Sequence, residues 1–188
     1  MTNNKIILGF TGFIASGKGT ASEYLAEKYN APSYRFSTML RDILNRIYVE
    51  SSRDNLIKTS EFIRETFGED TMAITLGKDV EKDQNDIIVV DGIRRMADIE
   101  YLKKMSGFVL IHIDADPKIR YERLIKRSEN TDDQSKTYEE FLADHERSTE
   151  VSIREVAEYA LEKIDNNGTF EELNKQIDNI VQKYGSQN

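Results

Sequence analysis

The chain has 188 residues, of which 38% are hydrophobic and 32% charged, and it contains 10 glycines, 2 prolines and no cysteine. This balance is typical of one globular unit, and it excludes a fibrous or disordered chain as well as disulfide scaffolds and cysteine-based sites. The formal net charge of −8 argues against extended nucleic acid as a partner, because such a field repels phosphate backbones, so a bound anion must be held by local amides and arginines.

The polar residues 1–5 lead into an apolar run that is too short for a signal peptide or a membrane span, so we expect a cytoplasmic protein that does not bind membranes. Strand-like and helix-like patterns then alternate along the chain. The expected strands cover residues 5–10, 33–36, 87–90, 108–113 and 159–164. The expected helices cover residues 18–29, 39–47, 56–67, 71–80, 97–105 and 118–127.

Two of these strands, 87–90 and 108–113, are continuously apolar, which is typical of strands buried on both faces of a parallel sheet. Each precedes a helix, so we expect an α/β fold with a doubly wound parallel sheet of about five strands and helices on both faces. The polar stretch 128–136 predicts a short lid. Thr137 with Glu140 resembles a capping box opening the next helix, and Thr169 is expected to cap a closing helix.

A phosphate-binding loop is predicted between the first strand and the first helix. Gly12 and Gly17-Lys18 have the spacing G-x4-G-K, which lets successive backbone N–H groups and the lysine surround a phosphate. The following helix adds its positive dipole end. A serine or threonine usually follows the lysine, but Gly19 stands there and the hydroxyl comes one position later. The residues expected to hold the nucleotide phosphates are Gly12, Ala15, Ser16, Gly17, Lys18, Gly19 and Thr20.

A carboxylate ends the strand 87–90: Asp91 stands where a magnesium ion bridging phosphates is bound in P-loop proteins. The alternative is an aspartate that only caps a turn. With the phosphate loop present, we favour the metal interpretation. His112, inside an apolar strand, is expected to be a satisfied core histidine.

These motifs together resemble the nucleoside monophosphate kinases of the P-loop NTPase fold, with adenylate kinase as the nearest well-known relative. Dephospho-coenzyme A kinases, phage deoxynucleotide kinases and an archaeal group of uncharacterised adenylate-kinase-like proteins are built similarly. The resemblance spans nearly the whole chain. It is carried by residues 17–20, 37–41, 91–95, 123–127, 132–133 and Arg147.

The resemblance also implies roles for single residues. Thr38 and Arg41 would hold the acceptor's phosphate, although the Gly-Asp usual in this motif is missing. Either Arg94 or Arg95 would be the acceptor-side arginine, because Asp-Gly-Ile-Arg-Arg replaces the family's Asp-Gly-Phe-Pro-Arg. The catalytic residues implied are Lys18, Arg123, Arg127 and Arg147, of which the three arginines would close over the transferring phosphoryl group.

The implied function is an ATP-dependent kinase that uses Mg²⁺ and moves the γ-phosphoryl group to a small nucleotide, a ribo- or deoxynucleoside monophosphate. It implies a single P-loop kinase domain over residues 1–188, with acceptor-binding helices at about 37–83 and a lid at about 123–147, acting as a monomer or small homo-oligomer. Two alternatives stay open at this point: a dephospho-coenzyme A kinase, and a P-loop NTPase or nucleotide-binding switch without a small-molecule acceptor. ATP and GTP are not distinguished as donors.

Overall fold

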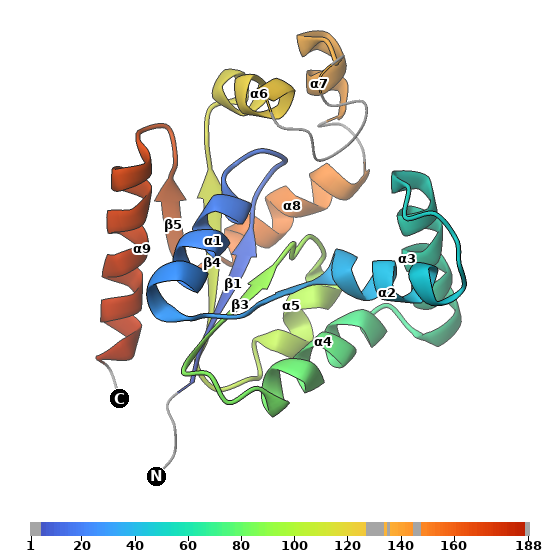
Figure 1. Ribbon diagram of the computed structural model, residues 1–188, viewed down its shortest axis with the longest axis horizontal. Helices are drawn as coiled ribbons and strands as arrows, with labels where there is room; N and C mark the ends of the chain where they lie inside the picture. The colour runs from blue at the N-terminus through green and yellow to red at the C-terminus, as the bar shows by residue number, and fades with distance from the viewer. Residues whose placement is uncertain (1–4, 127–133, 135, 145–147, 187–188) are drawn as a thin grey trace.

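A five-stranded parallel sheet runs through the middle of the molecule (Figure 1). The computed structural model describes residues 5–126, 134, 136–144 and 148–186, without the side chains of residues 53, 144 and 148–150. The strands are β1 (Ile6–Thr11), β2 (Ser33–Arg35), β3 (Ile87–Asp91), β4 (Phe108–Asp114) and β5 (Glu162–Asp165). Their order across the sheet is β2-β3-β1-β4-β5, and every neighbouring pair is parallel. The expected α/β fold with about five parallel strands is confirmed.

Helices cover both faces of this sheet, as Figure 1 shows. On one face α1 (Lys18–Tyr29) and α9 (Phe170–Gly185) share a core with the strands. The other face packs against α2 (Phe36–Arg46), α3 (Arg53–Phe67), α4 (Thr71–Lys82), α5 (Met96–Leu102) and α8 (Ser148–Glu158). The helices α6 (Pro117–Lys126) and α7 (Tyr138–Asp144) lie beyond the carboxyl end of the strands.

The two cores follow from the alternation of side chains along each strand. In β1, Leu8 and Phe10 enter the core beneath α1 and α9, whereas Ile7 enters the opposite core. All three side chains are at most 1% exposed. Because both faces are covered, the strand reads as a continuous apolar run in the sequence rather than as an alternating one.

Two of the expected helix starts are present as capping boxes. The Thr169 hydroxyl accepts from the Glu172 amide at 3.3 Å while the Glu172 carboxylate accepts from the Thr169 amide at 2.8 Å. Thr137 and Glu140 make the same reciprocal pair before α7. One expected strand was placed too early: β5 begins at Glu162, because residues 148–158 form α8 and Tyr159 and Ala160 close its last turn.

The strand order creates a switch point above β1. From β1 the chain crosses to β2 and returns to β3 on one side, and it then crosses to β4 on the other. In such sheets the connections diverge at this point and leave a crevice at the carboxyl ends of the strands. The loop between β1 and α1 lies at this crevice. Among the described residues, no helix is long and apolar enough to cross a membrane.

Candidate phosphate-transfer site

The loop between β1 and α1 has the backbone of a phosphate cradle. Gly12, Ala15 and Gly17 all have positive φ angles, of 148°, 59° and 105°. The two glycines are also required by space: a Cβ on Gly12 would lie 2.2 Å from the carbonyl oxygen of Ile113, and one on Gly17 would lie 2.0 Å from Asn166 Nδ2. Such backbone conformations and approaches are open to glycine and strained for other residues. Both glycines of the motif therefore fit the role predicted for them.

The lysine of the motif hydrogen-bonds back to the loop that precedes it. Lys18 is the first residue of α1, and its Nζ donates to the carbonyl oxygens of Gly12 at 2.7 Å and Phe13 at 2.9 Å. The ammonium group therefore lies over the loop at the positive end of the helix dipole. A cation in the first turn of a helix opposes this dipole. An anion bound by the loop would interact favourably with both positive charges.

Asn166, in the turn after β5, is hydrogen-bonded to the phosphate loop. Its Nδ2 donates to the carbonyl oxygen of Ser16 at 2.8 Å, and its own carbonyl oxygen accepts from Arg123 Nη2 at 2.9 Å. The side chain is 5% exposed. Sequence reasoning missed this residue; its only signal was the Asn-Asn-Gly turn after a strand. Arg123 is thereby held beside the phosphate loop, and burial lowers the pKa of its guanidinium.

Arg120 of α6 is buried beside the phosphate loop. It is 2% exposed, and its Nε donates to the carbonyl oxygen of Ala115 at 2.9 Å. Its guanidinium lies over the ring of Phe13, 4.9 Å from the ring centre, and 5.5 Å from that of Phe141. Arg120 therefore fixes α6 and α7 against the phosphate loop.

The carboxylate expected to hold a metal lies at the carboxyl end of β3, the strand that pairs with β1. Asp91 is 8% exposed, and its Oδ1 is buried without a hydrogen-bond partner among the described residues. Its Oδ2 pairs with Arg35 Nε at 3.1 Å. A buried, unpaired carboxylate oxygen beside a phosphate loop fits the oxygen ligands that Mg²⁺ prefers. Arg35 was not predicted, because a single arginine within a short strand carries no motif.

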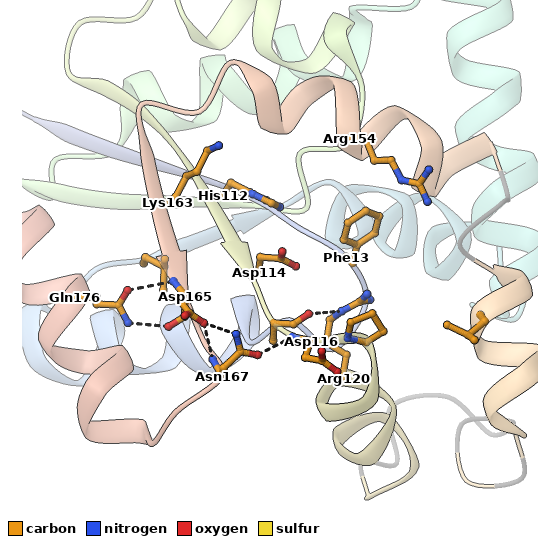
Figure 2. Close-up of a pocket in the computed structure, with 14 residues that line it drawn as sticks. Phe13, His112, Asp114, Asp116, Arg120, Arg154, Lys163, Asp165, Asn167 and Gln176 are labelled. Atoms are coloured by element: carbon orange, nitrogen blue, oxygen red, sulfur yellow. Dashed lines mark hydrogen bonds between the residues drawn. The ribbon is translucent and has the colours of Figure 1, made fainter.

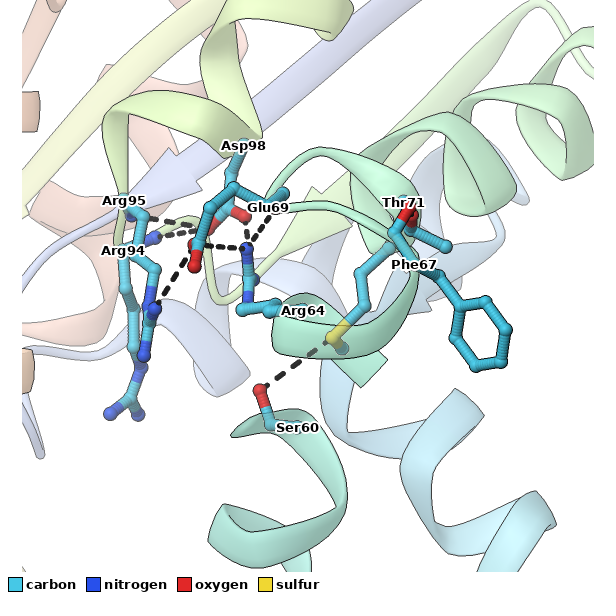
Figure 3. Close-up of polar contacts among 9 residues, drawn as sticks. Ser60, Arg64, Phe67, Glu69, Thr71, Arg94, Arg95 and Asp98 are labelled. Carbon is cyan, nitrogen blue, oxygen red and sulfur yellow. Dashed lines mark hydrogen bonds and ion pairs between the residues drawn. The ribbon is translucent and has the colours of Figure 1, made fainter. Parts of the chain in front are cut away.

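A buried ion pair fixes the loop of residues 92–95, where an acceptor-side arginine is predicted (Figure 3). Asp98 Oδ1 accepts from Arg64 Nη2 of α3 at 2.9 Å, and the two side chains are 2% and 5% exposed. Its Oδ2 accepts the backbone N–H groups of Arg94 and Arg95 at 3.2 and 3.1 Å. The Asp98 carboxylate thus connects α3 to the backbone of residues 92–95, hereafter the arginine loop.

The two arginines of this loop differ in their surroundings. Arg95 is half-buried, and its Nη1 lies 3.4 Å from Glu69 Oε2, in the connection between α3 and α4. The side chain of Arg94 is exposed. Figure 3 shows the two side chains next to each other at the edge of the Asp98 cluster. The contact with Glu69 restrains the Arg95 side chain.

The remaining predicted acceptor residues lie on α2. Thr38 is exposed in the first turn, and Arg41 is half-buried with Nη1 3.5 Å from the carbonyl oxygen of Ser51. Their proposed contacts with an acceptor remain predictions. Arg127 and Arg147 lie outside the described residues. The hydroxyl of Thr20 belongs to a half-buried side chain in the first turn of α1.

A polar pocket of about 970 Å³ opens beside the phosphate loop (Figure 2). Phe13 of the loop, His112 of β4 and Arg154 of α8 contribute to its wall. The expectation of a satisfied core histidine was wrong: His112 is half-buried, and its Nε2 has no hydrogen-bond partner among the described residues. Burial lowers the pKa of this imidazole, with Asp114 opposing the effect.

Comparison with known proteins agrees with this geometry. A protein family described as "AAA domain" matches residues 8–150. The UPF0200 protein MJ1399 of Methanocaldococcus jannaschii is 32% identical over 95% of this chain and 90% of its own length. Among solved structures, shikimate kinase from Bacteroides thetaiotaomicron superposes with a TM-score of 0.62 at 13% identity, covering 96% of this chain and 98% of that one. TT1252 from Thermus thermophilus gives 0.60 at 14% with the same coverage. At such identities the structures show a shared P-loop kinase-like fold.

Proposed function

This chain belongs to the AAA domain family of P-loop proteins and to the UPF0200 proteins, and from that premise we propose that it is an ATP-dependent kinase whose acceptor is a nucleoside monophosphate. The donor half of the proposal rests on the cradle between β1 and α1. Backbone N–H groups of the loop and Lys18 would hold the β- and γ-phosphates, as in other P-loop proteins. Phosphoryl transfer then needs alignment and neutralisation of charge more than covalent help from the protein.

The acceptor half rests on one observation: the loop of residues 92–95 supplies guanidinium groups, while the buried carboxylate beside it, Asp98, is already engaged. Asp98 accepts from Arg64 and from two backbone N–H groups, and of the two Asp91 oxygens one pairs with Arg35 while the other is the oxygen proposed to hold Mg²⁺. A hydroxyl acceptor gains from a carboxylate that can take its proton. A phosphate acceptor needs fixed positive charge instead. The arrangement therefore favours an acceptor that bears a phosphate at the reacting end.

Within this proposal each residue has a definite task. Asp91 would hold Mg²⁺, which would supply positive charge to the donor phosphates. Arg41 and the arginine loop would orient the acceptor's phosphate. Arg123, which lies beside the loop, would add positive charge near the transferred group, and the resemblance assigns the same task to Arg127 and Arg147.

The test is an acceptor screen with the full chain. The acceptors tested are each ribo- and deoxynucleoside monophosphate and dephospho-coenzyme A, with magnesium ATP or magnesium GTP as donor. Release of ADP or GDP from the donor is measured against a blank without acceptor. We expect release to rise at least tenfold with one or a few monophosphates. A rise with dephospho-coenzyme A alone would assign that kinase activity instead. Release that is the same with every addition would reject the kinase proposal and favour an NTPase or switch.

The product distinguishes transfer from stimulated hydrolysis. In the active mixture, each mole of diphosphate released from the donor should be matched by one mole of phosphorylated acceptor, with inorganic phosphate near the blank. The Lys18→Ala variant is the control for contaminating kinases, since its preparation should carry the same impurities but lack the lysine of the cradle.

A further inference from the structure

The end of strand β2 places a guanidinium group at the phosphate loop. Arg35 is the last residue of β2 and stands in register with Asp91 of β3. Its Nε lies 3.1 Å from Asp91 Oδ2, so the side chain crosses the carboxyl edge of the sheet toward the crevice. The Arg35 side chain is 38% exposed, whereas that of Asp91 is 11% exposed. The pair therefore has a buried carboxylate end and a guanidinium end that solvent and ligands can reach.

The Nη2 atom of this guanidinium lies against the first turn of α1. A Cβ built on Gly19 would lie 3.8 Å from Arg35 Nη2, which is ordinary van der Waals contact. Gly19 directly follows Lys18, at the position where a P-loop usually carries a serine or threonine hydroxyl. Arg35 therefore stands between Asp91 and the residue that lacks this hydroxyl.

The shape of a guanidinium group allows it to hold two anions at once. It carries five N–H donors in a planar fork, and one edge can pair with a carboxylate while another meets a phosphate. In this structure Nε contacts Asp91, and Nη2 lies 3.8 Å from the position that a Cβ on Gly19 would take. Asp91 thus orients the fork so that Nη2 lies beside the first turn of α1.

From these contacts we propose that Arg35 is a phosphate-binding residue of the donor site, which contacts the polyphosphate of the bound nucleotide beside Lys18 while Asp91 holds its Nε edge. The inference rests on the proposed nucleotide site. It assigns Asp91 a second task, the positioning of Arg35, in addition to any contact with Mg²⁺.

The experiment is a calorimetric titration of the full chain with ATP and with inorganic tripolyphosphate, each in EDTA and in Mg²⁺. Arg35→Met should raise the Kd of both ligands in EDTA by roughly 10- to 100-fold, the usual worth of a charged hydrogen bond. Arg35→Lys should recover part of the affinity, because it restores the charge without the fork. Arg46→Met, which changes an exposed arginine at the end of α2, should leave the Kd within about twofold.

A second variant separates phosphate binding from simple charge compensation. Arg35→Met leaves Asp91 without its partner, and a bare carboxylate would itself repel phosphate. The double change Arg35→Met with Asp91→Asn removes that repulsion, so binding in EDTA should stay weak if Arg35 contacts phosphate. If the double variant binds tripolyphosphate as the wild type does, Arg35 only neutralises Asp91 and the inference fails. Far-ultraviolet circular dichroism and thermal melting of each variant check the fold.

The same titration keeps this inference distinct from the proposed function. If the wild type binds ATP and Lys18→Ala does not, the nucleotide site stands, and the Arg35 variants alone decide the inference. If the wild type binds neither ATP nor tripolyphosphate in any buffer, both proposals are overturned together.

Discussion

The phosphate loop and the arginine loop follow the neighbouring strands β1 and β3, but they are held in different ways. The phosphate loop is shaped by its own backbone, with glycines packed against Ile113 and Asn166 so closely that a Cβ would collide. The arginine loop, residues 92–95, is held by a backbone hydrogen bond from Ile93 N to the carbonyl oxygen of Phe10 and by Asp98, whose Oδ2 accepts two of its backbone N–H groups. A loop shaped by its own backbone tolerates most side-chain changes around it, whereas a loop held largely by one carboxylate is weakened when that carboxylate is lost.

The largest effect should come from removing the side chain that places a fixed positive charge over the phosphate loop. Lys18→Ala should lower phosphoryl transfer by about 10²- to 10³-fold, since fixed positive charge at the transferred group is lost. The fold should persist, because the loop backbone is held by its glycines and by Asn166. Turnover and thermal melting of the variant measure the two effects. Lys104→Ala, an exposed lysine before β4, is the matched control and should retain full turnover.

Breaking the support of the arginine loop should cost stability as well as acceptor binding. Asp98→Asn leaves the buried Arg64 guanidinium without its counter-charge, so the free energy of unfolding should fall by about 3 kcal/mol. Adding Arg64→Met should restore part of this loss, because no uncompensated charge is then buried. Urea denaturation measures both variants. Glu100→Gln, which alters an exposed ion pair with Lys103, should change stability by less than about 0.5 kcal/mol. Equal losses in all three variants would contradict the role given to Asp98.

A smaller effect should separate the two arginines of that loop. Arg95 contacts Glu69, whereas Arg94 carries the more exposed side chain, so Arg94 is the better placed to reach an acceptor. Arg94→Met should raise the KM for the acceptor about tenfold or more, with little change in the KM for ATP. Arg95→Met should raise it by no more than a few fold. Steady-state kinetics with the acceptor found in the screen decides between them, and the reverse order would assign acceptor binding to Arg95.

The smallest effect concerns the pocket beside the phosphate loop and depends on pH. Burial lowers the pKa of His112, so the folded protein binds a proton there less readily than the unfolded chain does. Where the unfolded state binds more protons, stability falls as the pH decreases. Acidification from above the ordinary histidine pKa of about 6.5 to below it should therefore destabilise the wild type.

His112→Gln removes the titrating group and should flatten this part of the stability profile. Melting temperatures of the two proteins measured between about pH 8 and pH 5 test the expectation, because 6.5 lies inside that window. Parallel pH profiles for the wild type and the variant would show that His112 does not contribute.

Local sequence patterns predicted most of the fold. The apolar runs marked the strands, and reciprocal Thr and Glu pairs marked the starts of α7 and α9. They failed at Tyr159, because a short apolar run can end a helix as well as begin a strand. The glycine spacing and Lys18 identified the phosphate loop, since its conformation depends on neighbours in the chain.

The sequence by itself thus determined the parallel α/β sheet, the phosphate loop and the carboxylate that ends β3, because each depends on a pattern of residues close together in the chain. Only the tertiary structure decided which side chains serve that loop. Asn166 reaches Ser16 across 150 positions, and Asp98 reaches Arg64 across 34. Arg35 meets Asp91 because β2 pairs with β3 rather than with β1, its predecessor in the chain. Strand order brings such residues together, and no local pattern encodes it.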